Sequence, residues 1–234
     1  MIKDLQVTLY DVFGYLLPGI VFVGALATLF WAIFFPQPAL RVDLPTAEVW
    51  IIFLVSSYVA GHMAQALGNL IAWFRPSTED LILGTKGKLP EVFVTSCKAK
   101  AKDTLNVDLT NVSANWLYRF CDDAVIRSGK TGERDIYIYR EGFYRGIFVA
   151  FVMFSLATLA LILRLCWVEN HILKISTWDV GQGQLLFFLF LWIGWSWLAY
   201  RRHRRFGEYR VTHTMLGFLT VKEEKKTDAK KEPA

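Results

Sequence analysis

The chain has 234 residues, 54% of them hydrophobic, and its formal net charge is +5 at pH 7. The hydrophobic residues are concentrated in four blocks and the basic excess is equally local, which argues against a soluble globular domain and against nucleic-acid binding driven by overall charge. Cys97, Cys121 and Cys166 show no CxxC or metal-like spacing, so we expect free thiols.

The first apolar block covers residues 10–35, and no charge occurs between Asp11 and Arg41. A helix needs roughly 20 apolar residues to cross a bilayer core of about 30 Å, so this block predicts a membrane span. Residues 1–13 have amphipathic spacing and predict a short interfacial helix before the span.

A bend is expected where these two segments meet, because the stretch contains Gly14, Pro18 and Gly19 and proline removes a backbone donor. The bend is either a hinge used in gating or the place where an interfacial helix turns into the membrane. Both interpretations stay open at this point.

The second apolar block, residues 49–74, follows a short proline-rich linker and predicts an antiparallel hairpin with the first. Its polar side chains, at spacings of four, three and four, lie on one helical stripe: Tyr58, His62, Gln65 and Asn69. The stripe lines a water-filled path through an oligomer, or it forms hydrogen bonds between helices beside glycines that allow close approach. His62 has no carboxylate at helical spacing within this block, so a proton relay has little support.

Residues 75–142 are charged enough to be soluble and predict a small helical domain. Ser77 is a suitable N-cap for a first helix, with Asp80 three residues later. Further helices are expected at 91–102 and 113–128 and from about residue 133 into the third span.

Residues 143–200 contain the third and fourth apolar blocks and predict a second transmembrane hairpin, just as residues 1–74 hold the N-terminal amphipathic helix and the first hairpin. Residues 201–234 form a basic tail whose last part we expect to be disordered. Basic residues concentrate in the 75–142 domain and in this tail. The positive-inside bias therefore places both termini and the domain in the cytoplasm, with two short external loops, in a bacterial inner membrane.

No catalytic set can be assembled from the sequence, so we expect no enzyme activity, no cofactor and no metal. The GKT at 129–131 lacks the glycine that a phosphate-binding loop needs, because Ala124 occupies that position. The adjacent carboxylates Asp122 and Asp123 are interpreted as solvated helix charges.

Basic residues mixed with aromatic ones flank the third and fourth spans at Arg140, Arg145, Arg201, Arg202, Arg204 and Arg205. Such a cluster anchors the protein to anionic membrane lipids, at roughly 1 kcal/mol for each basic side chain. Stacking and charge are also how nucleotides are bound, so a nucleotide is the alternative ligand.

Three segments, YDVFGYLLPGIVF, SSYVAGHMAQALGNL and EGFYRGIFVAF, resemble small four-span bacterial membrane proteins of anti-phage defence loci, such as the membrane subunits of the Hailong and Kiwa systems. The resemblance covers the spans and not residues 76–132. It implies an inner-membrane homo-oligomer, with a tetramer favoured, that works with a cytosolic protein partner and opens a channel or disturbs the membrane on a signal.

The sequence therefore predicts an all-α integral membrane protein with four spans and a helical cytoplasmic domain between the second and third. The leading hypothesis is a channel-type antiviral effector gated through that domain, with the polar stripe as its path. The alternative is a membrane scaffold or sensor that recruits a soluble enzyme. A small transporter fits less well, because the sequence shows no internal repeat.

Overall fold

The computed structural model describes residues 2–34, 39–40, 46–73, 79, 83, 89–129, 131–167, 172–175 and 178–221. These residues are almost entirely helical. Among the described residues, four helices are long and apolar enough to cross a membrane. The predicted all-α membrane fold with four spans is thereby confirmed. The expected N-cap at Ser77 and the last part of the tail lie outside the described residues.

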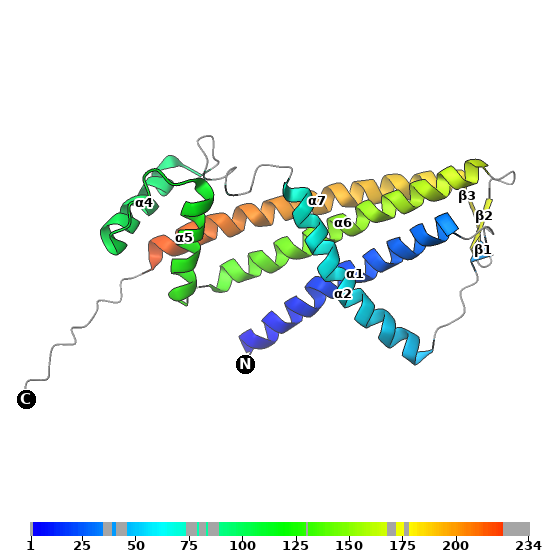
Figure 1. Cartoon of the computed structure of the whole chain (residues 1–234), viewed down its shortest axis with the longest axis horizontal. Helices are drawn as coiled ribbons and strands as arrows, with labels where there is room; N and C mark the ends of the chain where they lie inside the picture. Colours follow the sequence, from blue (N-terminus) through cyan, green and yellow to red (C-terminus); the bar gives the residue numbers. More distant parts are fainter. Residues whose placement is uncertain are drawn as a thin grey trace, which may run out of the picture. The chain divides into compact units, whose positions relative to one another are not determined.

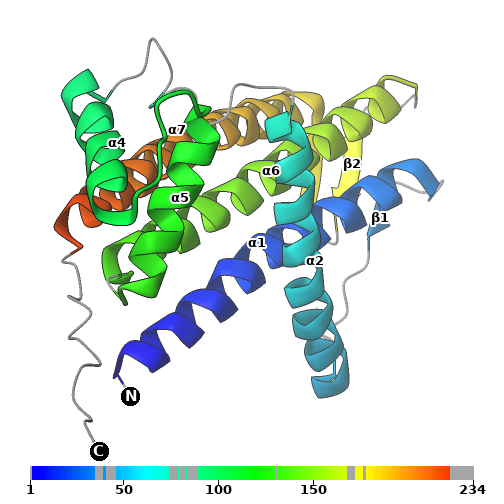
Figure 2. The same ribbon diagram turned by 60° about the vertical axis from the view of Figure 1, so that its left-hand side comes forward.

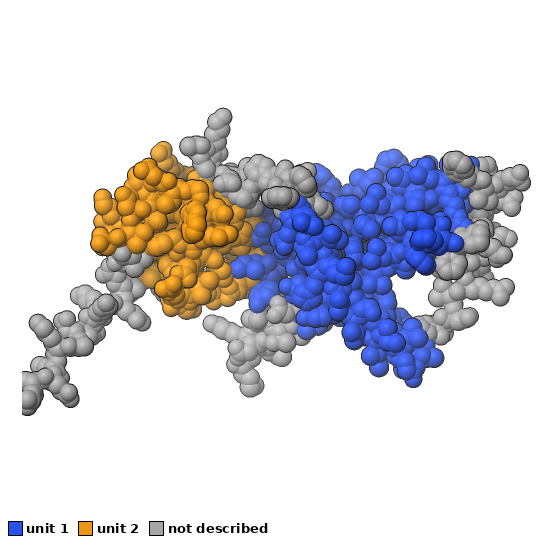
Figure 3. Space-filling model, viewed as in Figure 1, with its two compact units in different colours: residues 1–75, 138–206 blue, residues 76–137, 207–234 orange. Residues whose placement is uncertain are grey.

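The chain divides into two compact units (Figure 3). Unit 1 comprises Met1–Arg75 and Ile138–Phe206, and unit 2 comprises Pro76–Tyr137 and Gly207–Ala234. The expected division had placed residues 75–142 in one domain and 201–234 in a separate tail. The structure differs because the residues after 206 join the same unit as residues 76–137.

Unit 1 contains α1 (Ile2–Phe34), α2 (Ala47–Trp73), most of α6 (Gly132–Trp167) and the first part of α7 (Gln182–Thr220). Both views show α2 crossing α1 (Figures 1 and 2). A span needs roughly 20 residues, and α6 and α7 are much longer than that. The remainder of each helix belongs to unit 2, namely residues 132–137 of α6 and 207–220 of α7.

Within unit 1, α6 and α7 pack antiparallel through a ladder of aromatic pairs. Phe151 stacks on Trp192 with ring centroids 5.7 Å apart, and Tyr144 stacks on Phe206 at 5.4 Å. Phe148 and Tyr200 pair between them at 5.6 Å. Aromatic pairs contribute roughly 0.5–1.5 kcal/mol each beyond the area they bury, so this ladder holds the second hairpin together.

The two short loops contain strands that the sequence analysis did not predict. A three-stranded sheet is formed by β1 (Ala39–Leu40), β2 (Ile172–Ile175) and β3 (Trp178–Gly181). β1 pairs parallel with β2, and β2 pairs antiparallel with β3. The strands were missed because they are very short and their pairing joins segments far apart in the sequence. Their pairing brings both loops to the same end of the unit 1 helices.

At that end Arg164 of α6 is bonded to the last turn of α1. Its Nη1 donates to the carbonyl of Trp31 at 3.1 Å and to the carbonyl of Ala32 at 3.2 Å. The last carbonyls of a helix have no intrahelical donor, so a guanidinium from a neighbouring helix satisfies them.

Unit 2 is built from α4 (Glu91–Leu105), α5 (Ala114–Arg127) and the two helix ends contributed by α6 and α7. Ser113 caps α5 by accepting from the backbone N–H of Trp116 at 3.4 Å, and Asn106 ends α4 with a φ of 53°. The helices expected at 91–102 and 113–128 agree with α4 and α5 to within three residues.

The core of unit 2 depends on α7. Val211, Met215 and Phe218 are almost fully buried, and they pack with buried side chains from α4 and α5 such as Cys97 and Leu117. Their spacing of four and three residues places them on one helical face. A tail with only a basic anchoring role, as expected for residues 201–234, would not bury such a face. The described part of that segment is instead a helix.

Candidate functional site

The predicted polar stripe and the predicted bend meet at the crossing of α1 and α2. The buried face of α2 carries small side chains at Ser57, Ala60, Gly61, Ala64 and Gly68. A Cβ atom on Gly19 of α1 would overlap the Ser57 carbonyl, and a Cβ on Gly61 would overlap the Tyr15 carbonyl. The two backbones are therefore in direct contact, as is typical of membrane helices that meet through small residues.

The helix α1 continues through Pro18, so the expected separate helix over residues 1–13 is not observed. Pro18 has no N–H, and the carbonyl that it leaves without an intrahelical donor belongs to Gly14, four residues earlier. The side-chain Nε2 of Gln65 donates to that carbonyl at 3.2 Å. The interruption is thus repaired from α2, as is known for prolines in membrane helices. A gating hinge at Gly14, Pro18 and Gly19 stays a prediction.

The third helix to reach this point is α6. A Cβ on Gly146 would lie 3.0 Å from the Pro18 Cβ and 3.3 Å from the Gln65 Cγ. A Cβ on Gly142 would lie 3.2 Å from Oε1 of Gln65. Gln65 therefore lies in a close junction of three helices, and glycines on α6 leave the room for it.

The other three stripe residues are more open. Tyr15 of α1 stacks on His62 with ring centroids 3.7 Å apart and contacts Tyr58 edge-on at 6.0 Å. Tyr58, His62 and Asn69 are all exposed. Within the described part of the chain, no hydrogen bond is formed by the side chains of His62 and Asn69. The stripe therefore contacts α1 through Tyr58, His62 and Gln65. The polar groups of His62 and Asn69 have no hydrogen-bond partner among the described residues.

The predicted basic cluster does not form one patch of equivalent residues. Arg145 passes across Gly68 of α2, whose lack of a side chain makes room for it. The guanidinium of Arg140 lies 5.6 Å from the Phe206 ring centroid, and that of Arg201 lies 4.8 Å from the Trp197 ring. Arg202 and Arg205 are exposed, and Arg204 is half-buried.

Unit 2 contains an ionic network that the sequence analysis missed. Arg134 at the start of α6 binds Asp122 of α5 with two nitrogens, one of them 2.7 Å from Oδ2, and it also contacts Asp135 at 2.7 Å. Arg210 of α7 pairs with Glu79 at 2.7 Å, and both side chains are only 14% exposed. The interpretation of Asp122 as a solvated charge is wrong, because it pairs with Arg134, which belongs to the helix that follows α5. Asp123, by contrast, forms an exposed pair with Arg127 on its own helix.

The core of unit 2 also contains two thiols. Cys97 and Cys121 are fully buried and, like Cys166, they are free, as predicted. The contact with the Cys97 thiol and the burial of both side chains raise the pKa of Cys121 above its ordinary value. Burial likewise raises the pKa of the neighbouring Tyr118. Cys121 and Tyr118 are therefore neutral at physiological pH, and both belong to the core of unit 2.

Comparison of the chain with protein-family models, with curated proteins and with solved structures finds no match. The resemblance to membrane subunits of anti-phage defence systems stays a prediction. Among the described residues, no cluster of three or more histidine, cysteine or acidic side chains could hold a metal ion.

Proposed function

We propose that this protein is an oligomeric channel-type effector of the bacterial inner membrane that is gated through unit 2. The observation that carries the proposal is the pair His62 and Asn69 on α2. Both are exposed on a helix that can span a membrane, and neither side chain has a hydrogen-bond partner in the described part of the chain.

Polar side chains in a membrane helix are costly unless they meet a partner or water. Gln65 meets this requirement within the chain, because its side chain donates a hydrogen bond to the Gly14 carbonyl. His62 lies inside the span Ala47–Leu70 and then needs a second copy of the chain or an aqueous path, and Asn69, seven residues later on the same face, continues this line to the end of the span. A ring of subunits with this face toward its axis supplies both, and a tetramer is the favoured arrangement.

Gating through unit 2 is supported by the continuity of α6 and α7. Arg134 is held by Asp122 of α5, and Met215 is fully buried in the core of unit 2. Both belong to helices that continue into the spans. A signal that changes the packing of unit 2 would therefore act on the same two helices that form the third and fourth spans. With both termini and unit 2 in the cytoplasm, the signal would be cytosolic, as in the anti-phage systems that the spans resemble.

The test is ion flux from proteoliposomes that contain the full-length protein. The variant should replace His62 and Asn69 with leucine and keep Gln65, because Gln65 has a structural role. Met63→Leu is the matched control, since Met63 is exposed on another face of the same helix. Loss of flux in the double variant alone supports the channel. Equal flux in all three proteins would exclude this path.

A scaffold that recruits a cytosolic partner is the second candidate, and exposed apolar residues on unit 2 favour it. Val92 of α4 is 74% exposed and Trp116 of α5 is 65% exposed, and an exposed tryptophan is a frequent anchor residue of protein interfaces. If this reading is right, a stoichiometric partner should purify with the protein and be lost on replacing both residues with serine. Full flux without any partner would count against it.

A further inference from the structure

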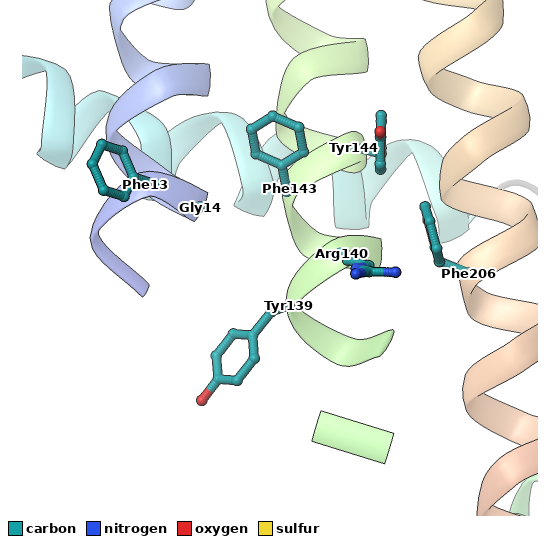
Figure 4. Close-up of a pocket in the computed structure, with 7 residues that line it drawn as sticks. All are labelled: Phe13, Gly14, Tyr139, Arg140, Phe143, Tyr144 and Phe206. Atoms are coloured by element: carbon teal, nitrogen blue, oxygen red, sulfur yellow. The ribbon is translucent and has the colours of Figure 1, made fainter. Parts of the chain in front are cut away.

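A cavity of about 410 Å³ lies among the helices of unit 1. It is lined by two residues of α1, one of α7 and four of α6 (Figure 4), which are Phe13, Gly14, Phe206, Tyr139, Arg140, Phe143 and Tyr144. The figure shows Arg140 and Phe206 on one side and Phe13 and Tyr139 on the other. Its volume is within the range of small-molecule sites.

The lining combines aromatic rings with one cation. Phe143 contacts Tyr144 edge-on at 5.1 Å, and Tyr144 stacks on Phe206, so the rings hold one another in place. Arg140 is exposed, and its guanidinium lies over the Phe206 ring. In the described part of the chain Arg140 forms no ion pair. The cavity thus offers a guanidinium that no described carboxylate pairs with, beside an apolar surface.

The position of the cavity along the helices matches the headgroup layer of a bilayer. Phe13 lies at the start of the apolar segment Val12–Phe34. The uncharged run of α6 begins at Gly146, and at 1.5 Å per residue about 9 Å of helix separates Arg140 from it. The polar layer on each side of the hydrocarbon is about 5–7 Å thick, so the backbone of Arg140 lies near its outer edge and the long side chain can reach the lipid phosphates.

We propose that this cavity binds a phosphate ester carried on an apolar or aromatic body. Arg140 holds the phosphate through charge-assisted hydrogen bonds, and Phe13, Tyr139 and Phe143 surround the body. The depth of Arg140 in the bilayer favours an anionic phospholipid as the bound phosphate ester. A soluble nucleotide carries the same phosphate chemistry. The cavity also touches Gly14, whose carbonyl accepts a hydrogen bond from Gln65. Resting on the proposed function, a phosphate ester bound here would change the packing at the α1–α2 crossing and thereby the channel.

The experiment measures lipid binding by the delipidated full-length protein in detergent, using native mass spectrometry with phosphatidylglycerol as the first probe. Arg140→Gln should weaken binding about tenfold, because it removes a charge-assisted contact. Arg202→Gln removes the same charge from an exposed position of α7 that does not line the cavity, and it should change binding less than about twofold.

A second variant tests the cavity without changing charge. A Cβ on Gly14 would meet no atom within 4 Å, so Gly14→Leu can fill the cavity without a clash at its first carbon. It should weaken binding as Arg140→Gln does while the melting temperature stays within a few degrees. Equal weakening by Arg140→Gln and Arg202→Gln, or no change with Gly14→Leu, would overturn the site.

The second probe is AMP, with inorganic phosphate beside it. Tighter binding of phosphatidylglycerol than of AMP supports the lipid. Arg140-dependent binding of AMP alone would keep the site and overturn the lipid assignment. Binding is measured without ion flux, so failure of this proposal and failure of the channel are distinguishable.

Discussion

The side-chain amide of Gln65 on α2 donates to the carbonyl of Gly14 on α1, the one carbonyl that Pro18 leaves without an intrahelical donor. One polar side chain of the stripe thus repairs the defect that the proline makes in the neighbouring helix. The structure gives Gln65 a role that is independent of any channel.

This relationship predicts a coupling between Gln65 and Pro18. Gln65→Leu should destabilise the protein, because it leaves the Gly14 carbonyl unsatisfied. In the Pro18→Ala background the backbone N–H returns, and the same change should cost less. The coupling energy should be about 1 kcal/mol, near the upper part of the range for hydrogen bonds between membrane helices. Denaturant-induced unfolding of the four proteins in micelles measures it, and strict additivity would contradict the assignment.

The backbone contact at the helix crossing predicts intolerance of any side chain at Gly61. Gly61→Ala should separate α1 from α2, because the new Cβ would overlap the Tyr15 carbonyl, and it should cost about 1–3 kcal/mol. Gly194→Ala is the matched control on α7, where a Cβ meets nothing within 4 Å and alanine gains about 0.5–1 kcal/mol in helix propensity. Thermal unfolding should therefore move in opposite directions in the two variants.

The role of α7 in unit 2 predicts a large effect of Phe218. Phe218 is only 2% exposed, so Phe218→Ala should destabilise unit 2 by about 3–5 kcal/mol. Leu216 on the same turn is 37% exposed, and Leu216→Ala should cost less than about 1 kcal/mol. Amide hydrogen exchange of α4 and α5, measured in the full-length protein, reports the stability of unit 2 in both variants. Unchanged protection in Phe218→Ala would mean that α7 does not hold the unit together.

The three free cysteines test the orientation in the membrane. Cys166 is exposed at the end of α6 that precedes β2, whereas Cys97 and Cys121 are buried in unit 2. If the short loops are external, a membrane-impermeant maleimide should label intact cells at Cys166 alone. Cys166→Ser should abolish the label. Labelling that appears only after lysis would place the short loops in the cytoplasm instead.

The membrane-spanning helices and the helices α4 and α5 were predictable because their causes are local. An uncharged run of sufficient length must form a helix in lipid, where each backbone group needs a partner within the segment. Ser113 and the helical spacing that follows it likewise mark the start of α5 within a few residues of sequence.

The candidate site was predictable only in part. The sequence placed Gln65, His62 and Asn69 on one stripe, because that depends on helical geometry alone. Which of them forms a hydrogen bond to another helix depends on the point where α1 and α2 cross. Glycines that are distant in sequence set this crossing point. The burial of Met215 and the pairing of Asp122 with Arg134 were missed for the same reason, since both need a partner from another segment.

What the amino-acid sequence determined by itself is therefore the number of spans, their helical state and the positions of most helix boundaries. Hydrophobicity and backbone hydrogen bonding act within one segment and require nothing else. The tertiary structure alone decided that the end of α7 completes unit 2, that the two loops pair as a sheet and that Gln65 satisfies the carbonyl freed by Pro18. Each of these is a contact between segments more than fifty residues apart, and its energy exists only once the helices have packed.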